Sequence, residues 1–250
     1  MASIIDERGY NQSFQSSRAQ TARLQRRAEA MVQEMQLPDA PEERALIHIL
    51  EIGCGMGEMA AIIARLTGAR VTGVDLSARF IGKAQARHRY PNLNFSVSDL
   101  TKEFPASATD RYHYIVGNGI LHHLYHHLDT FFLVLQRWLA PGGQLIFWEP
   151  NLWNPYIFLI FSVPPLRRLA KLEPDEMAFT KRYISKKLSV AGFAPVQATT
   201  RDFLLPNTPD FLIKPTIKIG EWFEQTPGLR TLAQSVFIVA TRPAETTGSL

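Results

Sequence analysis

The chain has 250 residues, of which 46% are hydrophobic and 20% are charged, and its formal net charge at pH 7 is +4. This composition is typical of a globular protein and excludes an intrinsically disordered chain. The small net charge is not the clustered basic face of a nucleic-acid-binding protein, so we expect no nucleic-acid partner. Four arginines near the N-terminus are interspersed with acidic residues, and we interpret them as a solvent-exposed helix face: Arg18, Arg23, Arg26 and Arg27.

Cysteine usage and hydropathy indicate where the protein works. Cys54 is the only cysteine, and a lone cysteine fits a reducing compartment because it cannot form an internal disulfide. Residues 1–10 lack the apolar stretch of a signal peptide. The longest apolar run, residues 156–163, is far shorter than the roughly 20 residues of a membrane-spanning helix. We predict a cytoplasmic protein without stable membrane insertion, and contact of this run with a membrane surface stays open.

The first part of the chain predicts a helix followed by a buried strand. Residues 13–36 contain no Gly or Pro and repeat apolar side chains at helical spacing, so they predict a helix that ends before Pro38. The apolar run over residues 45–52 predicts a strand buried on both faces. Glycines follow it, and residues 58–67 then predict a helix that Gly68 caps.

Strands and helices continue to alternate as far as Pro150. The segments that predict them are strand 70–75, helix 77–88 with Ser77 as N-cap, strand 93–98, strand 112–117, helix 129–139, a turn at 140–143 and strand 144–149. Because the connections are short, this order predicts a parallel sheet with helices on both faces.

Beyond Pro150 the pattern is interrupted twice. Residues 151–180 are rich in Pro and aromatic residues and predict an insertion over the C-terminal edge of the sheet, and residues 206–231 predict a second, loop-rich insertion. Between and after them lie a predicted helix (181–191) and two predicted strands (195–203 and 234–241). We therefore expect a mostly parallel seven-stranded α/β sheet, divided into an N-terminal helical cap (1–45), the first half of the α/β domain (46–150), an insertion that covers the substrate (151–180) and the rest of the domain (181–250).

The segment Glu51-Ile-Gly53-Cys54-Gly55-Met-Gly57 directly follows the first predicted strand. Glycines at such a place let the chain turn sharply and let a ligand approach the backbone, since no Cβ intervenes. Dinucleotide-binding loops prefer G-x-G-x-x-G, whereas here the third glycine comes one residue early. The dinucleotide position holds Glu58, whose carboxylate would repel a pyrophosphate at the start of the helix.

This glycine segment resembles the first motif of class I methyltransferases that use S-adenosylmethionine (SAM), which have a Rossmann-like fold. The resemblance implies that Glu51 neighbours the amino-acid part of SAM and that the backbone of Gly53, Cys54 and Gly55 packs on the cofactor. Asp75 ends the second predicted strand, 22 residues after Gly53, where a carboxylate can accept hydrogen bonds from ribose hydroxyls. Leu76 would then lie against the adenine. The alternative role for Asp75 is a helix cap, but Ser77 is the better cap.

The resemblance continues in register over residues 46–150. Asp99 follows the third predicted strand, where relatives accept a hydrogen bond from the adenine amino group, and Leu100 would supply its backbone N–H; a turn-forming aspartate is the alternative. Asn118 directly follows the fourth predicted strand, and its backbone would contact the methionine part of SAM. The product would be S-adenosyl-L-homocysteine (SAH).

Three side chains at this edge of the sheet are candidates for proton transfer: His122, His123 and Glu149. For each, a structural role in the core is the alternative. His126 and His127 repeat the first two histidines at a spacing of four, which on a helix can hold a metal. No evident third ligand accompanies them apart from Asp129, so we predict no metal site.

Aromatic side chains in the N-terminal segment and the insertions suit a planar or hydrophobic small molecule. They are Tyr10, Phe14, Trp148, Trp153, Tyr156, Phe158, Phe161, Phe179, Tyr183, Phe203, Phe211 and Trp222. We expect a SAM-dependent methyltransferase of an oxygen or nitrogen atom on such a metabolite. Two alternatives stay open: a nicotinamide-dependent oxidoreductase, and a catalytically silent SAM-binding subunit.

Overall fold

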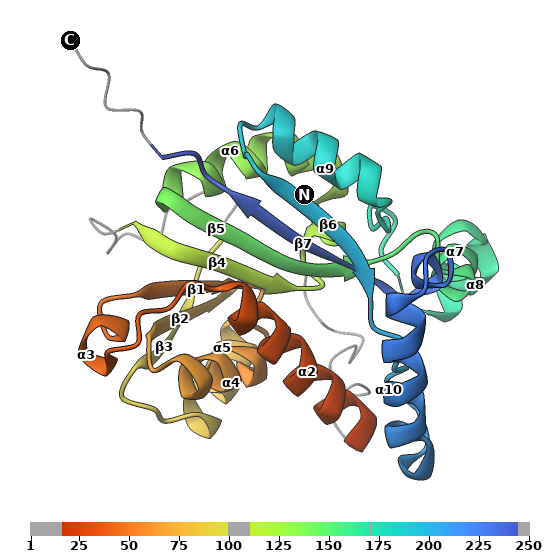
Figure 1. Ribbon diagram of the computed structural model, residues 1–250, viewed down its shortest axis with the longest axis horizontal. Coiled ribbons are helices and arrows are strands. Elements are labelled where there is room, and N and C mark those ends of the chain that lie inside the picture. The colour runs from red at the N-terminus through yellow and green to blue at the C-terminus, as the bar shows by residue number, and fades with distance from the viewer. Residues whose placement is uncertain (1–16, 100–110, 171, 245–250) are drawn as a thin grey trace.

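The computed structural model describes residues 17–99, 111–170 and 172–244 (Figure 1). Its strands are β1 (His48–Ile52), β2 (Arg70–Asp75), β3 (Leu93–Val97), β4 (Tyr112–Asn118), β5 (Leu139–Pro150), β6 (Val196–Arg201) and β7 (Ser235–Thr241). Its α-helices are α2 (Arg18–Glu34), α3 (Pro41–Arg44), α4 (Glu58–Thr67), α5 (Ala78–Arg87), α6 (Leu128–Trp138), α7 (Pro155–Ser162), α8 (Pro164–Leu169), α9 (Lys181–Val190) and α10 (Asp210–Gln225). Two 3₁₀ helices are η1 (Leu121–His127) and η2 (Leu229–Leu232).

The strands form one seven-stranded sheet in the order β3-β2-β1-β4-β5-β7-β6. Neighbours from β3 to β5 pair in parallel, and β7 runs antiparallel to both β5 and β6. The predicted mostly parallel, seven-stranded sheet with helices around it is confirmed. The chain leaves β1 toward β2 on one side, and β4 lies on the other side. This reversal creates the kind of crevice in which open α/β sheets bind ligands.

Helices cover both faces of the sheet, α2, α4 and α5 on one and α6 and α9 on the other (Figure 1). Successive strand residues point to opposite faces. Ile49 and Val116 therefore join the core beneath α2 and α4, whereas Leu50 and Ile115 join the core beneath α6 and α9. All four side chains are fully buried, which explains why the central strands have continuous apolar sequences.

Local signals in the sequence locate several element ends correctly. The Ser77 hydroxyl accepts a hydrogen bond from the backbone N–H of Phe80 and caps α5. Gly68 ends α4 with a φ of +69°, which glycine adopts without steric cost. The predicted turn at 140–143 does not precede the strand, so this prediction is wrong. Strand β5 already begins at Leu139, which pairs with Tyr112, and the register shifts after this pair.

The loop-rich character predicted for the insertion over residues 206–231 is also wrong. This segment forms α10 and η2, although Pro215 lies inside α10. Two exposed ion pairs join α10 to α2, Arg26 with Glu221 at 2.8 Å and Arg18 with Asp210 at 3.4 Å, and each contributes at most about 1 kcal/mol. Propensity is thus a weak guide to this helix.

The two ends of the insertion over residues 151–180 lie side by side. Asn151 and Phe179 form an isolated parallel bridge, and the N–H of Leu152 donates to the carbonyl of Phe179 at 2.8 Å. The helices α7 and α8 between these ends lie beyond the carboxyl ends of β4 and β5 (Figure 1). Within the described part of the chain, no helix combines the length and the apolar character needed to cross a membrane. The division of the chain into the four predicted segments stays a prediction.

The interpretation of the N-terminal arginines as one solvated face is wrong for two of them. Arg23 and Arg27 reach inward from α2, and each donates from Nε to Asp202 Oδ2, at 2.7 and 2.8 Å. Arg27 is 7% exposed and also lies over the Trp148 ring, with 5.1 Å between Cζ and the ring centroid. Burial lowers the pKa of Arg27 to about 10, so it stays charged at neutral pH. Only Arg18 and Arg26 remain at the surface.

We expect Asp202→Asn to lower the free energy of unfolding by about 3 kcal/mol, because two buried guanidinium groups lose their counter-charge. Asn tolerates the φ of +76° at this position, so backbone strain does not contribute. Urea unfolding followed by circular dichroism measures the change. Glu221→Gln, which breaks the exposed pair with Arg26, is the control and should cost less than about 1 kcal/mol. Equal losses in the two variants would contradict a special role for Asp202.

Candidate functional site

Polar side chains stand at the carboxyl ends of five neighbouring strands. These are Glu51 on β1, Asp75 on β2, Asp99 after β3, Asn118 on β4 and Glu149 on β5. Because the five strands are parallel, these ends meet at one edge of the sheet. The sequence predicted all five residues as site candidates, and the structure brings them to this one edge, beside the reversal of strand order.

The glycine loop between β1 and α4 is shaped for close approach. Gly53 has a φ of +65°, and a Cβ built there would lie 2.6 Å from Ile120 Cδ1. A side chain at this position is therefore excluded by both conformation and space. The backbone N–H of Gly55 donates to Asp75 Oδ2 at 2.9 Å. This hydrogen bond joins the loop after β1 to the end of β2.

Glu51 is buried directly beneath this loop. Its side chain is 2% exposed, and among the described residues Oε2 has no hydrogen-bond partner. Burial raises the pKa of Glu51 well above its ordinary value, the Ala60 backbone opposes this shift, and the nearby Glu58 and Asp75 add to it. A buried carboxylate with an unpartnered oxygen destabilises the protein unless a ligand pairs with it. Glu51 therefore marks a place for a cationic or hydrogen-donating group.

Asp75 has the geometry of a group that can bind hydroxyls. Its two oxygens accept hydrogen bonds from the N–H groups of Gly55 and Ser77, both at 2.9 Å, and each oxygen keeps a further lone pair. Burial raises the pKa of Asp75. The next residue, Leu76, is 43% exposed and offers an apolar surface beside it. Asp99 is partly buried, and Leu100 lies outside the described residues.

Asn118 is linked to the N-terminal helix, which the sequence analysis missed. Its Oδ1 accepts a hydrogen bond from Arg27 Nη1 at 2.7 Å. The signal was present, because Arg27 is three residues after Leu24 and four before Met31 and so lies on the apolar stripe of α2. An arginine on that stripe needs a buried partner, and Asn118 and Asp202 supply two.

Glu149 organises the turn that follows β4. Its carboxylate accepts hydrogen bonds from the backbone N–H groups of Ile120, Leu121 and His122, at 2.9, 2.7 and 3.2 Å. The same carboxylate lies 2.9 Å from His122 Nδ1. Because the carboxylate is the acceptor in these contacts, we assign the ring proton of His122 to Nδ1, which leaves Nε2 as the lone-pair nitrogen.

His123 pairs with a residue that the sequence analysis did not identify, Glu176, from the loop before α9. His123 Nδ1 lies 2.9 Å from Glu176 Oε1. Burial alone would lower the pKa of His123, but the hydrogen bond and charge of Glu176 outweigh it, so the pKa is raised. The pKa of Glu176 is lowered for the converse reason: its burial raises it, and His123 lowers it more. No local motif marks Glu176, because it lies 53 residues beyond its partner.

The histidines spaced four apart, His122 with His126 and His123 with His127, do not lie on a common helix face. η1 is a 3₁₀ helix with a kink at Leu124, and four residues on a 3₁₀ helix are not stacked. His126 and His127 are exposed, and Asp129 pairs instead with Lys187 at 2.6 Å. Neither predicted histidine pair is brought together around a common point.

Comparisons with known proteins agree with this geometry. Residues 49–143 match a family model described as a methyltransferase domain. The chain is 30% identical over 157 residues to a demethylmenaquinone methyltransferase of Chlorobaculum tepidum, covering 61% of this chain and 62% of the relative. It is 36% identical over 171 residues to a phthiotriol/phenolphthiotriol dimycocerosates methyltransferase of Mycobacterium leprae, with 61% and 62% covered. The matched region is thus less than two-thirds of each relative.

A solved structure extends the likeness to the whole fold. The crystal structure of a SAM-dependent methyltransferase from Archaeoglobus fulgidus superposes with a TM-score of 0.62 at 17% identity, covering 93% of this chain and 98% of that one. Residues 49–143 thus match a methyltransferase domain model, and the chain shares the fold of a SAM-dependent methyltransferase. The glycine loop, Glu51 and Asp75 lie at the carboxyl ends of β1 and β2, and their contacts with a cofactor stay a prediction.

Cys54 lies within the glycine loop after β1 and is buried. Burial raises the pKa of its thiol, and the charges of Glu51 and Asp75 raise it further. A thiol in this setting stays protonated and is a poor nucleophile. Cys54 therefore contributes its small size and its backbone: its N–H donates to the carbonyl of Val74 at 3.0 Å.

The aromatic residues predicted to line a substrate site differ in their exposure. Trp148, Phe161 and Phe179 are buried, whereas Tyr183 and Phe203 are partly buried. The exposed members are Trp153, Tyr156, Phe158, Phe211 and Trp222. Tyr10 and Phe14 lie outside the described residues. Phe161 of α7 meets His122 edge-on, with 6.2 Å between ring centroids, so the insertion places an apolar wall next to the histidine pair.

A separate hollow of about 440 Å³ lies at the opposite edge of the sheet, where β4 begins and β7 ends. Its lining includes Tyr114, Gln144, Thr241 and one carboxylate, Glu34, but no histidine. This hollow lacks the paired acid and base groups of the edge with Glu51 and Glu149. We therefore take that edge, and not the hollow, as the candidate functional site.

Glu51→Gln should change the pH dependence of stability. The folded chain holds the Glu51 proton more tightly than the unfolded chain, so stability is lost as pH rises from the ordinary glutamate range through the raised folded pKa. We expect the wild-type free energy of unfolding to fall relative to Glu51→Gln by at least about 1.4 kcal/mol between about pH 5 and about pH 8. Urea unfolding at both pH values measures this difference. The exposed Glu43→Gln is the control, and an equal pH response in the two variants would contradict the prediction.

Proposed function

We propose that this chain is a SAM-dependent methyltransferase that methylates an oxygen or nitrogen atom of a small hydrophobic, aromatic-bearing metabolite. The observation that carries the proposal is the pair of carboxylates around the glycine loop. Glu51 has a buried, unpartnered oxygen, and Asp75 is fixed to the loop backbone at Gly55. SAM has an ammonium group and two ribose hydroxyls that suit these two acceptors.

The remaining cofactor contacts follow from the same arrangement. Gly53 and Gly55 carry no side chain, and the side chain of Cys54 between them is small and buried. Leu76 offers its exposed surface to the adenine. We further assign Asp99 and Leu100 to the adenine edge, and the backbone of Asn118 to the methionine part.

The residue at the start of α4 argues against a nicotinamide cofactor. Glu58 occupies the first turn of that helix, where a dinucleotide places its pyrophosphate. A carboxylate there repels phosphate groups, whereas SAM carries none. The oxidoreductase alternative is therefore disfavoured by the charge of a single residue.

The turn after β4 supplies a group for proton transfer, which a silent binding subunit would not need. When bound, SAM supplies a methyl group that is already activated on a sulfonium. The acceptor must present a lone pair behind this methyl group and lose its proton. We propose that His122 Nε2 takes this proton while Glu149, 2.9 Å from Nδ1, stabilises the resulting imidazolium. Glu149 is a positioning residue, and His123, which is already paired with Glu176, is the second candidate base.

The surroundings of His122 support an apolar acceptor. Phe161 borders its ring, and residues 151–180 place α7 and α8 beyond the strand ends as a cover. Such a cover excludes water and holds planar molecules by ring contacts. We propose that the substrate is a free small molecule rather than a nucleic acid, and that the enzyme works in the cytoplasm, which its lone buried thiol suits.

Calorimetric titration with SAM, SAH and NAD tests the cofactor. We expect micromolar binding of the two adenosyl compounds and none of NAD. Asp75→Ala should weaken SAM binding at least tenfold, about 1.4 kcal/mol, because the ribose acceptor is lost. Asp39→Asn, at an exposed loop position before β1, is the matched control. Binding of NAD, or no adenosyl binding by folded protein, would overturn the proposal.

Phenols of graded acidity test the base. We expect His122→Gln to lower kcat about 100- to 10,000-fold on weakly acidic phenols and naphthols, while SAM affinity stays within about threefold. On acceptors already ionised at the assay pH the loss should shrink, since no proton remains to be removed. His126→Gln, on the exposed side of η1, is the control. A loss that is equal for all acceptors would show that His122 is structural.

A further inference from the structure

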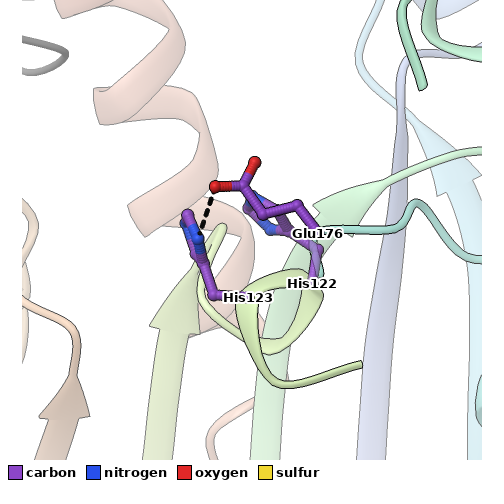
Figure 2. Close-up of side chains that lie close together, drawn as sticks. All are labelled: His122, His123 and Glu176. Carbon is purple, nitrogen blue, oxygen red and sulfur yellow. Dashed lines mark ion pairs between the residues drawn. The ribbon is translucent and has the colours of Figure 1, made fainter. Parts of the chain in front are cut away.

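Three donor side chains meet beyond the carboxyl end of β4: His122, His123 and Glu176 (Figure 2). One ligand atom of each lies within 4.8 Å of the ligand atoms of the other two, the one such group among the described residues. The histidines come from η1 and the glutamate from the loop before α9, so the cluster exists only in the folded protein. We propose that it binds one transition-metal ion of the zinc type.

The histidine closest to β5 is already oriented for a metal. His122 Nδ1 is held by Glu149 Oε2 at 2.9 Å, and Glu149 is itself fixed by backbone N–H groups. Metal-binding histidines usually donate their second ring N–H to a carboxylate in this way, which fixes the tautomer and aims the other nitrogen at the ion. His122 thus presents Nε2 on a rigid support.

The carboxylate of the cluster has unused capacity. Glu176 is 5% exposed, and its Oε2 has no hydrogen-bond partner among the described residues. Its other oxygen shares a hydrogen bond with His123 Nδ1 at 2.9 Å. A buried, unpartnered carboxylate oxygen beside two imidazoles is a donor set that a cation would satisfy.

The distances are close to those of a coordinated ion. Ligand atoms about 2.0–2.1 Å from a tetrahedral zinc ion lie about 3.3 Å apart. His123 Nδ1 and Glu176 Oε1 are at 2.9 Å, and no pair of ligand atoms exceeds 4.8 Å. Small side-chain adjustments therefore suffice, and binding would release the proton shared by His123 and Glu176. Two imidazoles and one carboxylate form a three-ligand set that favours zinc over magnesium or calcium and leaves a fourth position open.

Metal binding here would compete with the proposed chemistry. The ion takes the Nε2 lone pair of His122, which the proposed function uses to accept a proton. Zinc should therefore inhibit methyl transfer without displacing the cofactor, which binds at Glu51 and Asp75. This inhibition rests on the proposed function, whereas the binding of the ion does not.

Calorimetric titration of the metal-free, full-length protein with Zn²⁺ tests the site, and the visible spectrum with Co²⁺ reports the coordination geometry. We expect one ion per chain and a tetrahedral Co²⁺ spectrum. Glu176→Gln and His123→Gln should each weaken Zn²⁺ binding at least tenfold. His126→Gln and His127→Gln, which remove exposed histidines of the same 3₁₀ helix, should leave it unchanged. Circular dichroism and SAM titration verify that each variant is folded.

Other outcomes would overturn the inference. Wild-type protein that binds no Zn²⁺ at one ion per chain, or a Co²⁺ spectrum typical of octahedral surface binding, rejects the site. Zn²⁺ binding that survives in Glu176→Gln but is lost in His126→Gln places the ion at surface histidines instead. Methyl transfer assayed with and without a chelator separates the two proposals, since failure of the methyltransferase assay in chelator leaves the calorimetric result for zinc intact.

Discussion

The arrangement of the site depends on one buried carboxylate. Glu149, at the end of β5, accepts three consecutive backbone N–H groups from the chain that leaves β4 and also holds His122 Nδ1. A turn that leaves three buried N–H groups unpaired would be strongly unfavourable, so without this carboxylate η1 would not start where it does. The positions of His122 and His123, and through His123 that of Glu176, all follow from the side chain at the end of the neighbouring strand.

The N-terminal helix α2 contacts the same edge of the sheet through the side chain of Arg27. Arg27 binds Asn118 at the end of β4 and Asp202 after β6, and its guanidinium lies over Trp148 of β5. One buried cation thus connects α2 to three strands, and it stays tolerable because its charge is matched by Asp202. Asn118 borders the proposed cofactor, so any shift of α2 would also displace Asn118 at the site. Through the hydrogen bond of Arg27 to Asn118, α2 is therefore linked to the edge of the sheet that holds the candidate site.

The sequence predicted what local pattern controls. Buried runs, caps such as Ser77 and the glycine loop located the central strands and their helices, and strand ends alone placed Glu51, Asp75 and Asn118 at one edge. What it missed depends on contacts between distant segments. The proline in α10 favoured a loop, but the chain forms a helix there. Glu176 carries no motif, and its role follows from the way the insertion folds back over His123.

Two buried glutamates at this edge of the sheet differ in whether the protein itself satisfies their oxygens. Glu149 and Glu51 stand near the ends of β5 and β1 and are 1% and 2% exposed. The oxygens of Glu149 are satisfied by the protein itself, so that carboxylate stabilises the fold whether or not a ligand is bound. Glu51 keeps an oxygen without a partner and has a raised pKa, a state that destabilises the ligand-free protein. Natural proteins retain such a group where a ligand relieves it. The contrast between these two side chains therefore supports the proposal that Glu51 faces the ligand, whereas Glu149 holds the turn that carries His122 in place.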